Sequence, residues 1–527
     1  MYSKESKDKN ILTGALTLAI SVIIVKVIGF VYKLPLSYIL GDEGMGYFNT
    51  AYTVFTFFYM IAAGGLPRAV SILITESGFT YSKSDADYAV IILLKMFFKV
   101  GVALCAVTLI FARAITLAVG NPSSYLALIF VSPSIIFVSI SGVIRGYMNA
   151  EGRLSSIAIS EVIEGVIKFI IGLSLALWSY RRGFNYQTIA AFTILGVSLG
   201  SFISCMFLFV SYKTEKTNEK EGQKCELTIK KYEVITSVLK KCCPIALSSA
   251  IMSISAIIDL GLIMRRLSEI GIDEKTAVIQ YGNYTTLVIP MLNLVSAITA
   301  PISTAALPHL TETNVKKSII SLASLGENTV YFLTLITAPL SLGFAFFPEN
   351  ILSLLFEDSS AYRAAPLLCA ISFSAFFLPL LTLLNTMLEA VGKAYLGMLS
   401  TSLGAILKLA LSYILIGRKG ILGAPIGTSA AYALSAFISL IFVVYFLELP
   451  FKILSPAIIN STLAFIAVGG ARLILTPHLA SHSPIGFIAA VMLSAIIYVS
   501  LACIFMHRRI FGLFESVKIA KKYKAEL

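Results

Sequence analysis

SPSIIFVSISGVIRGYMNAEGR, residues Ser132 to Arg153, resembles the segment 240 residues later, SFSAFFLPLLTLLNTMLEAVGK, residues Ser372 to Lys393. Both segments are long apolar runs that close on a glycine followed by a basic residue. The register continues without a gap, since Lys168 then matches Lys408 and Gly183 matches Gly423. Such matches at one fixed offset favour duplication over chance similarity between apolar runs. The sequence therefore predicts two repeated halves.

Composition identifies the kind of protein that these halves form. Of 527 residues, 57% are apolar and 13% are charged, against about 45–50% and about 25% in soluble globular chains. Mean hydropathy is +0.88, and uninterrupted apolar runs of about 20 residues, long enough to span a bilayer, recur along the chain. These runs exceed the ~10 alternating residues of a transmembrane barrel strand. We therefore predict an all-α, polytopic membrane protein, which excludes a soluble enzyme and a disordered scaffold.

Apolar runs bounded by charged, Gly, Pro or Asn-rich breaks predict about fourteen membrane helices. Six in each half make two parallel repeats, an N-lobe and a C-lobe, which is a transporter architecture whose two bundles rock about a central site. Two extra helices follow. The predicted ranges are 11–40, 46–75, 88–118, 124–150, 154–180, 186–212, 234–264, 276–309, 318–347, 362–391, 394–416, 422–447, 451–473 and 484–506.

These helices give the predicted domain organisation. The N-lobe covers residues 1–212, a charged linker 213–233, the C-lobe 234–450, the extra helices 451–506, and a basic tail 507–527. An even helix count puts both termini on one side. Lys and Arg are enriched in the loops of that side, which predicts cytoplasmic termini in a multi-pass protein of the cell (plasma) membrane. The net charge of +13 then reflects topology and anionic membrane lipids, and it does not indicate nucleic acid.

Charged residues inside predicted spans are candidates for function, because each costs about 2.5–3.5 kcal/mol at the bilayer centre on insertion scales. Lys26 lies at the midpoint of the first helix, and Lys33, seven residues on, shares its face. Arg68 follows the helix breaker Gly64-Gly65 and Arg145 ends the repeated segment. Both arginines are equally well explained as cavity residues or as anchors at the cytoplasmic interface.

Acidic residues form a second set of candidates, for ion pairing or ion coupling. Glu161, Glu164 and Lys168 share one face of the fifth helix, and Glu164 and Lys168 have the i, i+4 spacing of an ion pair. A neutralised stripe between helices is the simpler interpretation of this pattern. The other charged candidates lie in the second half of the chain: Asp259, Glu389 and Lys408.

Motifs for catalysis are missing from the sequence. Gly392-Lys393 is followed by Ala394, so no phosphate loop for ATP is formed, and no nucleophile, metalloprotease or metal-ligand pattern occurs. We predict a protein that moves a substrate without converting it, with no catalytic residue, metal or cofactor. Coupling to Na⁺, to H⁺ or to the membrane potential stays open.

Several motifs resemble the stage V sporulation protein B (SpoVB) and YtgP family, which groups with MurJ-like lipid flippases in the multidrug/oligosaccharidyl-lipid/polysaccharide exporter superfamily. The resemblance spans nearly the whole chain. Two positions differ from these patterns, since Asn283 replaces an acidic residue and Lys26 an arginine. The matching motifs are Gly29-Phe30, Gly41-Asp42-Glu43-Gly44, Gly65-Leu66-Pro67, Val143 to Tyr147, Ser160 to Lys168, Gln280-Tyr281-Gly282 and Ser303 to Pro308.

This resemblance implies a flippase for a lipid-linked (polyprenyl-pyrophosphate) saccharide, such as a peptidoglycan precursor, in cell-wall or sporulation polysaccharide biosynthesis. Lys26, Lys33, Arg68 and Arg145 would hold the pyrophosphate, with Asn283 among the polar contacts. One alternative is a cation-coupled multidrug exporter of the same superfamily. Another is a non-transporting membrane scaffold that recruits cell-wall synthases through the 213–233 linker and the tail.

Overall fold

The computed structural model describes residues 2–80, 83–218, 236, 256–315, 319–447, 454–475, 486–489 and 491–503. Over these residues the chain is helical, with no strand, and it divides into two compact units, Met1–Thr286 and Leu287–Leu527. The predicted linker from residue 219 onward and the basic tail lie outside the described residues.

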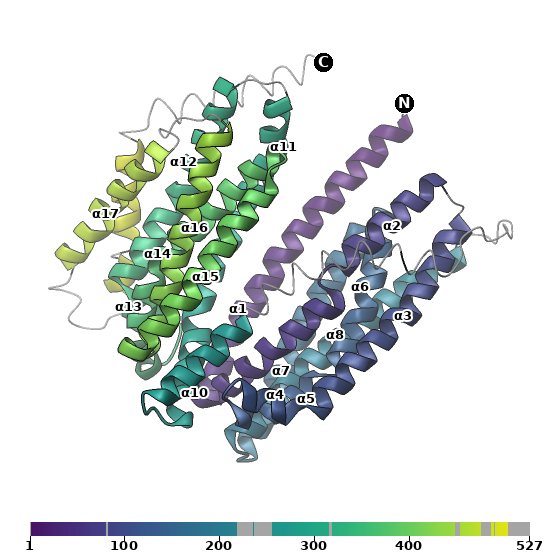
Figure 1. Ribbon diagram of the computed structural model, residues 1–527, viewed down its shortest axis with the longest axis horizontal. Helices are drawn as coiled ribbons and strands as arrows, with labels where there is room; N and C mark the ends of the chain where they lie inside the picture. The colour runs from purple at the N-terminus through teal and green to yellow at the C-terminus, as the bar shows by residue number, and fades with distance from the viewer. Residues whose placement is uncertain are drawn as a thin grey trace. The chain divides into compact units, whose positions relative to one another are not determined.

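Unit 1 contains the first group of helices (Figure 1). Within it α1 packs on α7, α8 and α10, while α6 packs on α2, α3 and α8. A π-helix, Tyr284–Val288, follows α10 across the end of the unit. The elements are α1 (Tyr2–Ala63), α2 (Leu66–Thr80), α3 (Lys83–Ile110), α4 (Ala112–Ala118), a 3₁₀ turn (Pro122–Ser124), α5 (Tyr125–Val131), α6 (Ser134–Ala150), α7 (Leu154–Arg181), α8 (Tyr186–Asn218), a helical stretch over 256–269 and α10 (Glu274–Asn283).

Unit 2 is built around α14, which contacts α11, α12 and α16, while α15 pairs with α16 and α17 packs on α12. Figure 1 shows α15 and α16 running side by side. The elements are α11 (Ile289–Val315), α12 (Ile319–Phe346), α13 (Pro348–Ser353), α14 (Asp358–Ala390), α15 (Ala394–Lys419), a 3₁₀ turn (Gly420–Leu422), α16 (Gly423–Leu447), α17 (Ser455–Leu475) and helical residues at 486–489 and 491–503.

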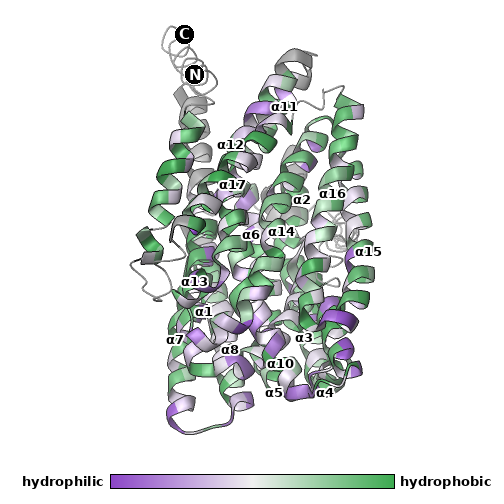
Figure 2. Cartoon of the chain, turned by 90° about the vertical axis from the view of Figure 1, so that its left-hand side faces the viewer, coloured by the Kyte–Doolittle hydropathy of each residue, from purple (hydrophilic) through white to green (hydrophobic). Residues whose placement is uncertain are grey.

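The helices are apolar enough to cross a membrane, and Figure 2 shows hydrophobic residues along most of their length. Among the described residues, ten continuous helices pass by length and composition, or eleven if the bent pair of Pro122–Val131 and Ser134–Ala150 is one span. A polytopic helical membrane protein is thus confirmed, whereas the count of fourteen is not. Ala394–Leu447 alone has 54 residues, and about 20 suffice to span a bilayer.

Glycine and proline explain where the helices differ from the predicted ranges. Gly41, with φ 61, kinks the long helix α1, a backbone conformation that favours glycine. The predicted helix 46–75 is interrupted at Gly64-Gly65, and Pro67 stands in the first turn of α2, where its missing N–H costs no helical hydrogen bond. The structure likewise splits the predicted helix 124–150 just before α6, next to Pro133.

The two hydrophobic cores support the duplication. Leu66, Val70, Val90, Leu93 and Val143 belong to the core of unit 1. The positions 240 residues later, Ala306, Leu310, Val330, Leu333 and Leu383, belong to the core of unit 2. Gly152 and Gly392, also 240 residues apart, end matching helices with the same φ of 76. The repeat thus begins earlier in the chain than the apolar sequence match indicates.

The boundary between the compact units lies at Thr286, not in the 213–233 linker. The reason is that α10 crosses α1 at close range. A Cβ atom added to Gly282 would lie 2.3 Å from the carbonyl oxygen of Asp42 and 2.9 Å from the amide nitrogen of Gly46. Only glycine permits this backbone-to-backbone contact, which holds α10 within unit 1.

Gly282→Ala is expected to lower the free energy of unfolding by about 1–3 kcal/mol or more, because the new methyl group meets backbone atoms that cannot turn aside. Gly29→Ala, also in a helix of unit 1, is the matched control, since nothing lies within 4 Å of its Cβ position. Detergent-induced unfolding of the purified variants measures both values. Equal stability of the two variants would contradict the close crossing.

Candidate functional site

A polar cluster links α6, α7 and α8 in the interior of unit 1. The Arg145 guanidinium pairs with Glu164 at 3.1 Å, the two side chains being 13% and 28% exposed. Arg145 also donates hydrogen bonds to Ser160 and Ser204, both at 3.3 Å. The other Glu164 oxygen accepts a hydrogen bond from Ser201 at 2.9 Å. Such complete pairing is what a half-buried ion pair needs to offset its desolvation.

This arrangement differs from the ion pair that sequence spacing indicates between Glu164 and Lys168. Glu164 turns towards Arg145 on a neighbouring helix, where the planar guanidinium offers several donors. The Lys168 ammonium lies instead over the ring of Tyr52, 4.7 Å from its centroid, and 5.7 Å from that of Tyr32. Glu161 is half-buried and has no hydrogen bond or ion pair with any residue in the described part of the chain.

Lys33 lies close to this lysine. Its ammonium donates a hydrogen bond to the backbone carbonyl of Thr285, at 3.0 Å, inside the π-helix. The Lys168 ammonium approaches the ring of Tyr32, the residue that precedes Lys33 in α1. Neither forms an ion pair with an acidic side chain of the described ranges. Unit 1 therefore holds two positive charges together, next to tyrosine rings and a backbone carbonyl.

The other predicted basic residues are arranged differently. Lys26 is exposed, in a stretch of α1 where Val22, Ile23 and Val27 are also exposed. It has no hydrogen bond or ion pair to a described residue. Arg68 stands in the first turn of α2, and its side chain lies outside the described residues. The structure thus brings Lys33 towards Lys168, and Arg145 towards Glu164.

Asn283 belongs to the crossing of α1 with α10. Its side-chain amide donates a hydrogen bond to Asp42 at 3.2 Å. Next to Asp42, Glu43 pairs with Lys275 at 3.1 Å and accepts a hydrogen bond from the Tyr47 hydroxyl at 3.0 Å. At the start of α10, Asp273 caps the helix by accepting a hydrogen bond from Thr276, which lowers the pKa of its carboxyl group. The motif that contains Asp42 and the motif that Asn283 directly follows therefore meet in space.

Unit 2 carries a neutral version of the Arg145 cluster. Asn385, 240 residues after Arg145, donates a hydrogen bond to Thr401 at 3.3 Å and accepts one from Ser439 at 2.8 Å. Gly404 takes the place of Glu164. Of the remaining candidates, Glu389 is exposed, whereas Lys408 and Asp259 are half-buried and have further contacts. The charged cluster is therefore a feature of unit 1.

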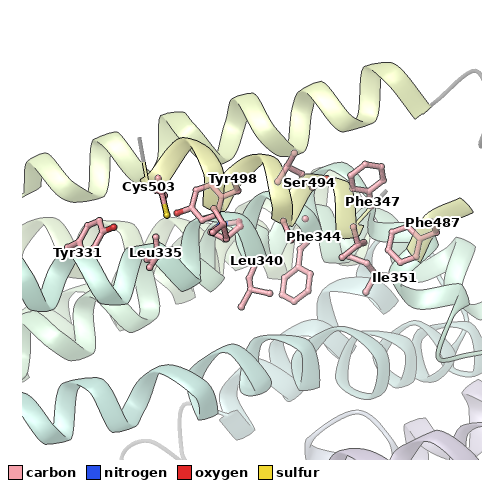
Figure 3. A pocket seen from close by; sticks show the side chains of 17 residues that line it. Tyr331, Leu335, Leu340, Phe344, Phe347, Ile351, Phe487, Ser494, Tyr498 and Cys503 are labelled. Carbon is pink, nitrogen blue, oxygen red and sulfur yellow. The ribbon is translucent and has the colours of Figure 1, made fainter. Parts of the chain in front are cut away.

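An apolar cavity of about 560 Å³ lies within unit 2, lined by α12, α13, α17 and the residues 487–503. Figure 3 shows Phe344, Phe347, Ile351 and Phe487 gathered at one end and the Tyr498 hydroxyl near the other. Gly343 leaves open space in the wall, since nothing lies within 4 Å of its Cβ position. The lining suits a hydrocarbon chain.

The amino-acid sequence does not reveal the partners of the charged residues. Tyr52 and Thr285 are distant in sequence from the lysines that they contact, and no motif marks the π-helix. Lys95 and Lys99, exposed in α3, also lie within a candidate span. These two lysines could have been found by the rule that singled out Lys26, namely that a charge within an apolar run is costly.

Comparison with known proteins places the chain among membrane proteins of polysaccharide synthesis. The model of the family "Polysaccharide biosynthesis protein" matches residues 11–314. Stage V sporulation protein B of Bacillus subtilis (strain 168) is 24% identical over 420 residues, 79% of this chain and 80% of that protein.

Two solved structures share the fold. A lipid II flippase MurJ in an inward closed conformation has a TM-score of 0.71 and 14% identity, covering 94% of this chain and all of that one. An inward-facing MATE multidrug resistance transporter of the MOP superfamily has a TM-score of 0.61 and 15% identity, and the match covers 82% of this chain and 98% of that one. Both structures are of transport proteins and neither is an enzyme.

Proposed function

The chain belongs to the polysaccharide biosynthesis protein family, and from that premise we propose that it is a flippase for a lipid-linked saccharide. The substrate would be a polyprenyl diphosphate that carries a saccharide, such as a peptidoglycan precursor. Its head group would cross the cell membrane by alternating access, with both termini of the protein in the cytoplasm.

The pair of Lys33 and Lys168 is the observation that carries this proposal. Two ammonium groups without an acidic partner among the described residues are costly inside a membrane-spanning unit. A diphosphate would offset this cost, because it bears more than one negative charge and strong acceptor oxygens for both groups. Lys26 and Arg68, on α1 and α2, stay further basic candidates for contacts with the head group.

The cavity of unit 2 supports the lipid part of the proposal. Its lining is made of aliphatic and aromatic side chains, and two of its walls, α17 and residues 487–503, come from the helices beyond the repeat. We assign the polyprenyl chain to it, because an apolar lining of matching shape can hold a hydrocarbon chain by van der Waals packing.

Gly343→Leu is expected to reduce transport about tenfold, because the added side chain would occupy the space that the polyprenyl chain needs. Gly470→Leu is the matched control: Gly470 also has nothing within 4 Å of its Cβ position, but it does not line the cavity. Initial transport rates of the two variants in reconstituted vesicles test this. Equal rates would contradict the assignment of the polyprenyl chain to this cavity.

A cation-coupled multidrug exporter is the second candidate. The fold is shared with MATE transporters, and Glu161 is a half-buried carboxylate without an ion pair among the described residues. Against it, a cationic drug would meet the ammonium groups of Lys33 and Lys168 in the same unit. A scaffold for cell-wall synthases would act through the linker and tail, which lie outside the described residues.

Binding separates these candidates. Native mass spectrometry of the purified protein with a polyprenyl diphosphate disaccharide should give a bound complex, and the matching polyprenyl monophosphate should bind more weakly. A cationic dye should not compete. Binding of the dye without binding of the diphosphate would overturn the proposal.

A further inference from the structure

Two exposed lysines of α3 face away from the rest of unit 1. Lys95 and Lys99 are four residues apart, so they lie one above the other on the same side of the helix. The opposite side packs on α6, where a Cβ atom added to Gly101 would lie 2.9 Å from the Ser139 hydroxyl. Lys99 is two positions from Gly101, which is about 200° around the helix. Figure 1 shows α3 at the edge of the helices of unit 1. Neither lysine has a hydrogen bond or ion pair with a residue that the structure describes.

The depth of these lysines in the membrane is unusual. The candidate span of α3 is Tyr88–Ile110, 23 residues, of which about 20 are enough to cross the hydrocarbon. Whichever 20 of them do so, Lys99 lies within about two residues of the midplane and Lys95 within about six. At 1.5 Å per residue these distances are at most about 3 Å and 9 Å. A charge at this depth is costly unless it is paired.

The surroundings of the two lysines suit another helix. Ile91, Phe98 and Val102 are exposed on the same side of α3, and together with Lys95 and Lys99 they form what we call the lysine face. Ala103 is exposed at its border, and small residues let helices approach closely in membranes. Association of helices in lipid is driven by van der Waals packing and by polar contacts between them. The lysine face offers both.

A lipid head group does not match the depth of the lysine face. Lipid phosphates lie beyond the edge of the hydrocarbon, about 15 Å from the midplane. Lysine reaches towards the interface on a stem of only four carbons, too short for Lys99 to cover most of that distance. The counter-charge must therefore come from a side chain that is itself near the middle of the membrane.

A second copy of this chain does not supply that side chain. The same face of another copy would set lysines against lysines. Elsewhere in the described ranges the exposed acidic side chains stand at or near helix ends, as Glu274 and Glu389 do. Glu161 and Glu164, within α7, are only half-exposed, and Glu164 is paired with Arg145. Charge complementarity thus favours a different protein.

We propose that the lysine face of α3 docks a transmembrane helix of another membrane protein, one that carries an Asp or Glu near the middle of its span. The carboxylate of that residue would accept hydrogen bonds from both ammonium groups, since one helical turn separates them and charged hydrogen bonds of this kind are strong. The flanking apolar side chains would pack against the partner helix. This proposal does not depend on the identity of the transported molecule.

Two synthetic leucine-rich transmembrane peptides test the lysine face, one with a central glutamate and its twin with a central glutamine. The full-length protein, fused to a fluorescent protein, is reconstituted in phosphatidylcholine vesicles, and energy transfer to a dye on the peptide measures association. The glutamate peptide should bind about tenfold more tightly than its twin. The double variant Lys95→Met with Lys99→Met should bind both peptides equally. Equal binding of the two peptides to the wild type would overturn the proposal, even if the variant fails to fold.

Arg181→Met with Arg182→Met is the matched control. These arginines are also neighbouring exposed cations of unit 1, but they lie at the C-terminal end of α7. The control should keep the preference for the glutamate peptide. If it loses this preference as fully as the lysine variant, net charge and not the lysine face recognises the peptide. If the wild type retains spin-labelled phosphatidylglycerol through Lys95 and Lys99 and ignores the glutamate peptide, the lysines bind lipid, which would also overturn the proposal.

Discussion

Replacing Lys33 and Lys168 together with alanine is expected to slow transport of a polyprenyl diphosphate saccharide at least about 100-fold. A hydrogen bond to a charged group contributes about 1.5–3 kcal/mol, so two contribute about 3–6 kcal/mol, and each 1.4 kcal/mol is a factor of ten. The Lys168 ammonium approaches the ring of Tyr32, the neighbour of Lys33, and neither lysine has an acidic partner in the described ranges. Initial rates in vesicles with equal amounts of protein measure the effect.

Lys393→Ala is the control for this experiment. Lys393 also lies over an aromatic ring, at 3.8 Å from the centroid of Phe446, but it belongs to unit 2 and immediately precedes α15. Its loss should leave the rate within about twofold, because this contact is remote from unit 1, and a cation–π contact near the surface contributes only about 0.5–1 kcal/mol to stability. A double variant of Lys33 and Lys168 that transports as fast as Lys393→Ala would contradict the role of the lysine pair.

Arg145→Met is expected to lower the free energy of unfolding by about 3–5 kcal/mol. The substitution leaves the Glu164 carboxylate half-buried without its ion pair, and an uncompensated charge of this kind is strongly destabilising. The double variant Arg145→Met with Glu164→Leu should recover much of the loss, since apolar residues of similar volume replace buried ion pairs at little cost. Detergent-induced unfolding gives both values.

Unit 2 provides the reason to expect this recovery. At the corresponding place it has Asn385 and Gly404 with no ion pair between them, and its helices still pack. Ser201→Ala is the control for loss of a single neutral donor to Glu164, with an expected cost of about 1.5–3 kcal/mol at most. A double variant less stable than Arg145→Met would mean that the ion pair itself, not the unpaired charge, determines stability.

Much of the fold can be predicted from sequence because it depends on local features. Apolar runs fix the helices, and the match of Gly152 with Gly392 identifies the repeat. The break at Gly41 is predicted, since the polar run Gly41 to Gly44 separates two apolar runs, whereas hydropathy does not reveal the break at Gly64, which lies within an apolar run. The placement of α10 in unit 1 depends on Gly46 meeting Gly282, a contact between residues more than two hundred positions apart.

The site is harder to predict from sequence for the same reason, since its contacts join residues that are distant in the chain. Spacing along one helix pairs Glu164 with Lys168, but the actual partner, Arg145, lies on another helix. Lys33 can be recognised from the sequence because a charge in an apolar run is conspicuous, whereas its acceptor, Thr285, lies in a π-helix that no residue pattern marks. The position of Lys26 within an apolar run makes it a candidate, and the structure adds that its side chain is exposed.

Transport in proteoliposomes tests the central claim most directly. The wild-type protein is reconstituted in vesicles that contain a fluorescent polyprenyl diphosphate disaccharide, and its arrival in the opposite leaflet is followed against a cationic dye and against the polyprenyl monophosphate analogue. We predict rapid transfer of the diphosphate, slower transfer of the monophosphate and no movement of the dye. Movement of the dye, with the diphosphate transferred no faster than in vesicles without protein, would contradict the account.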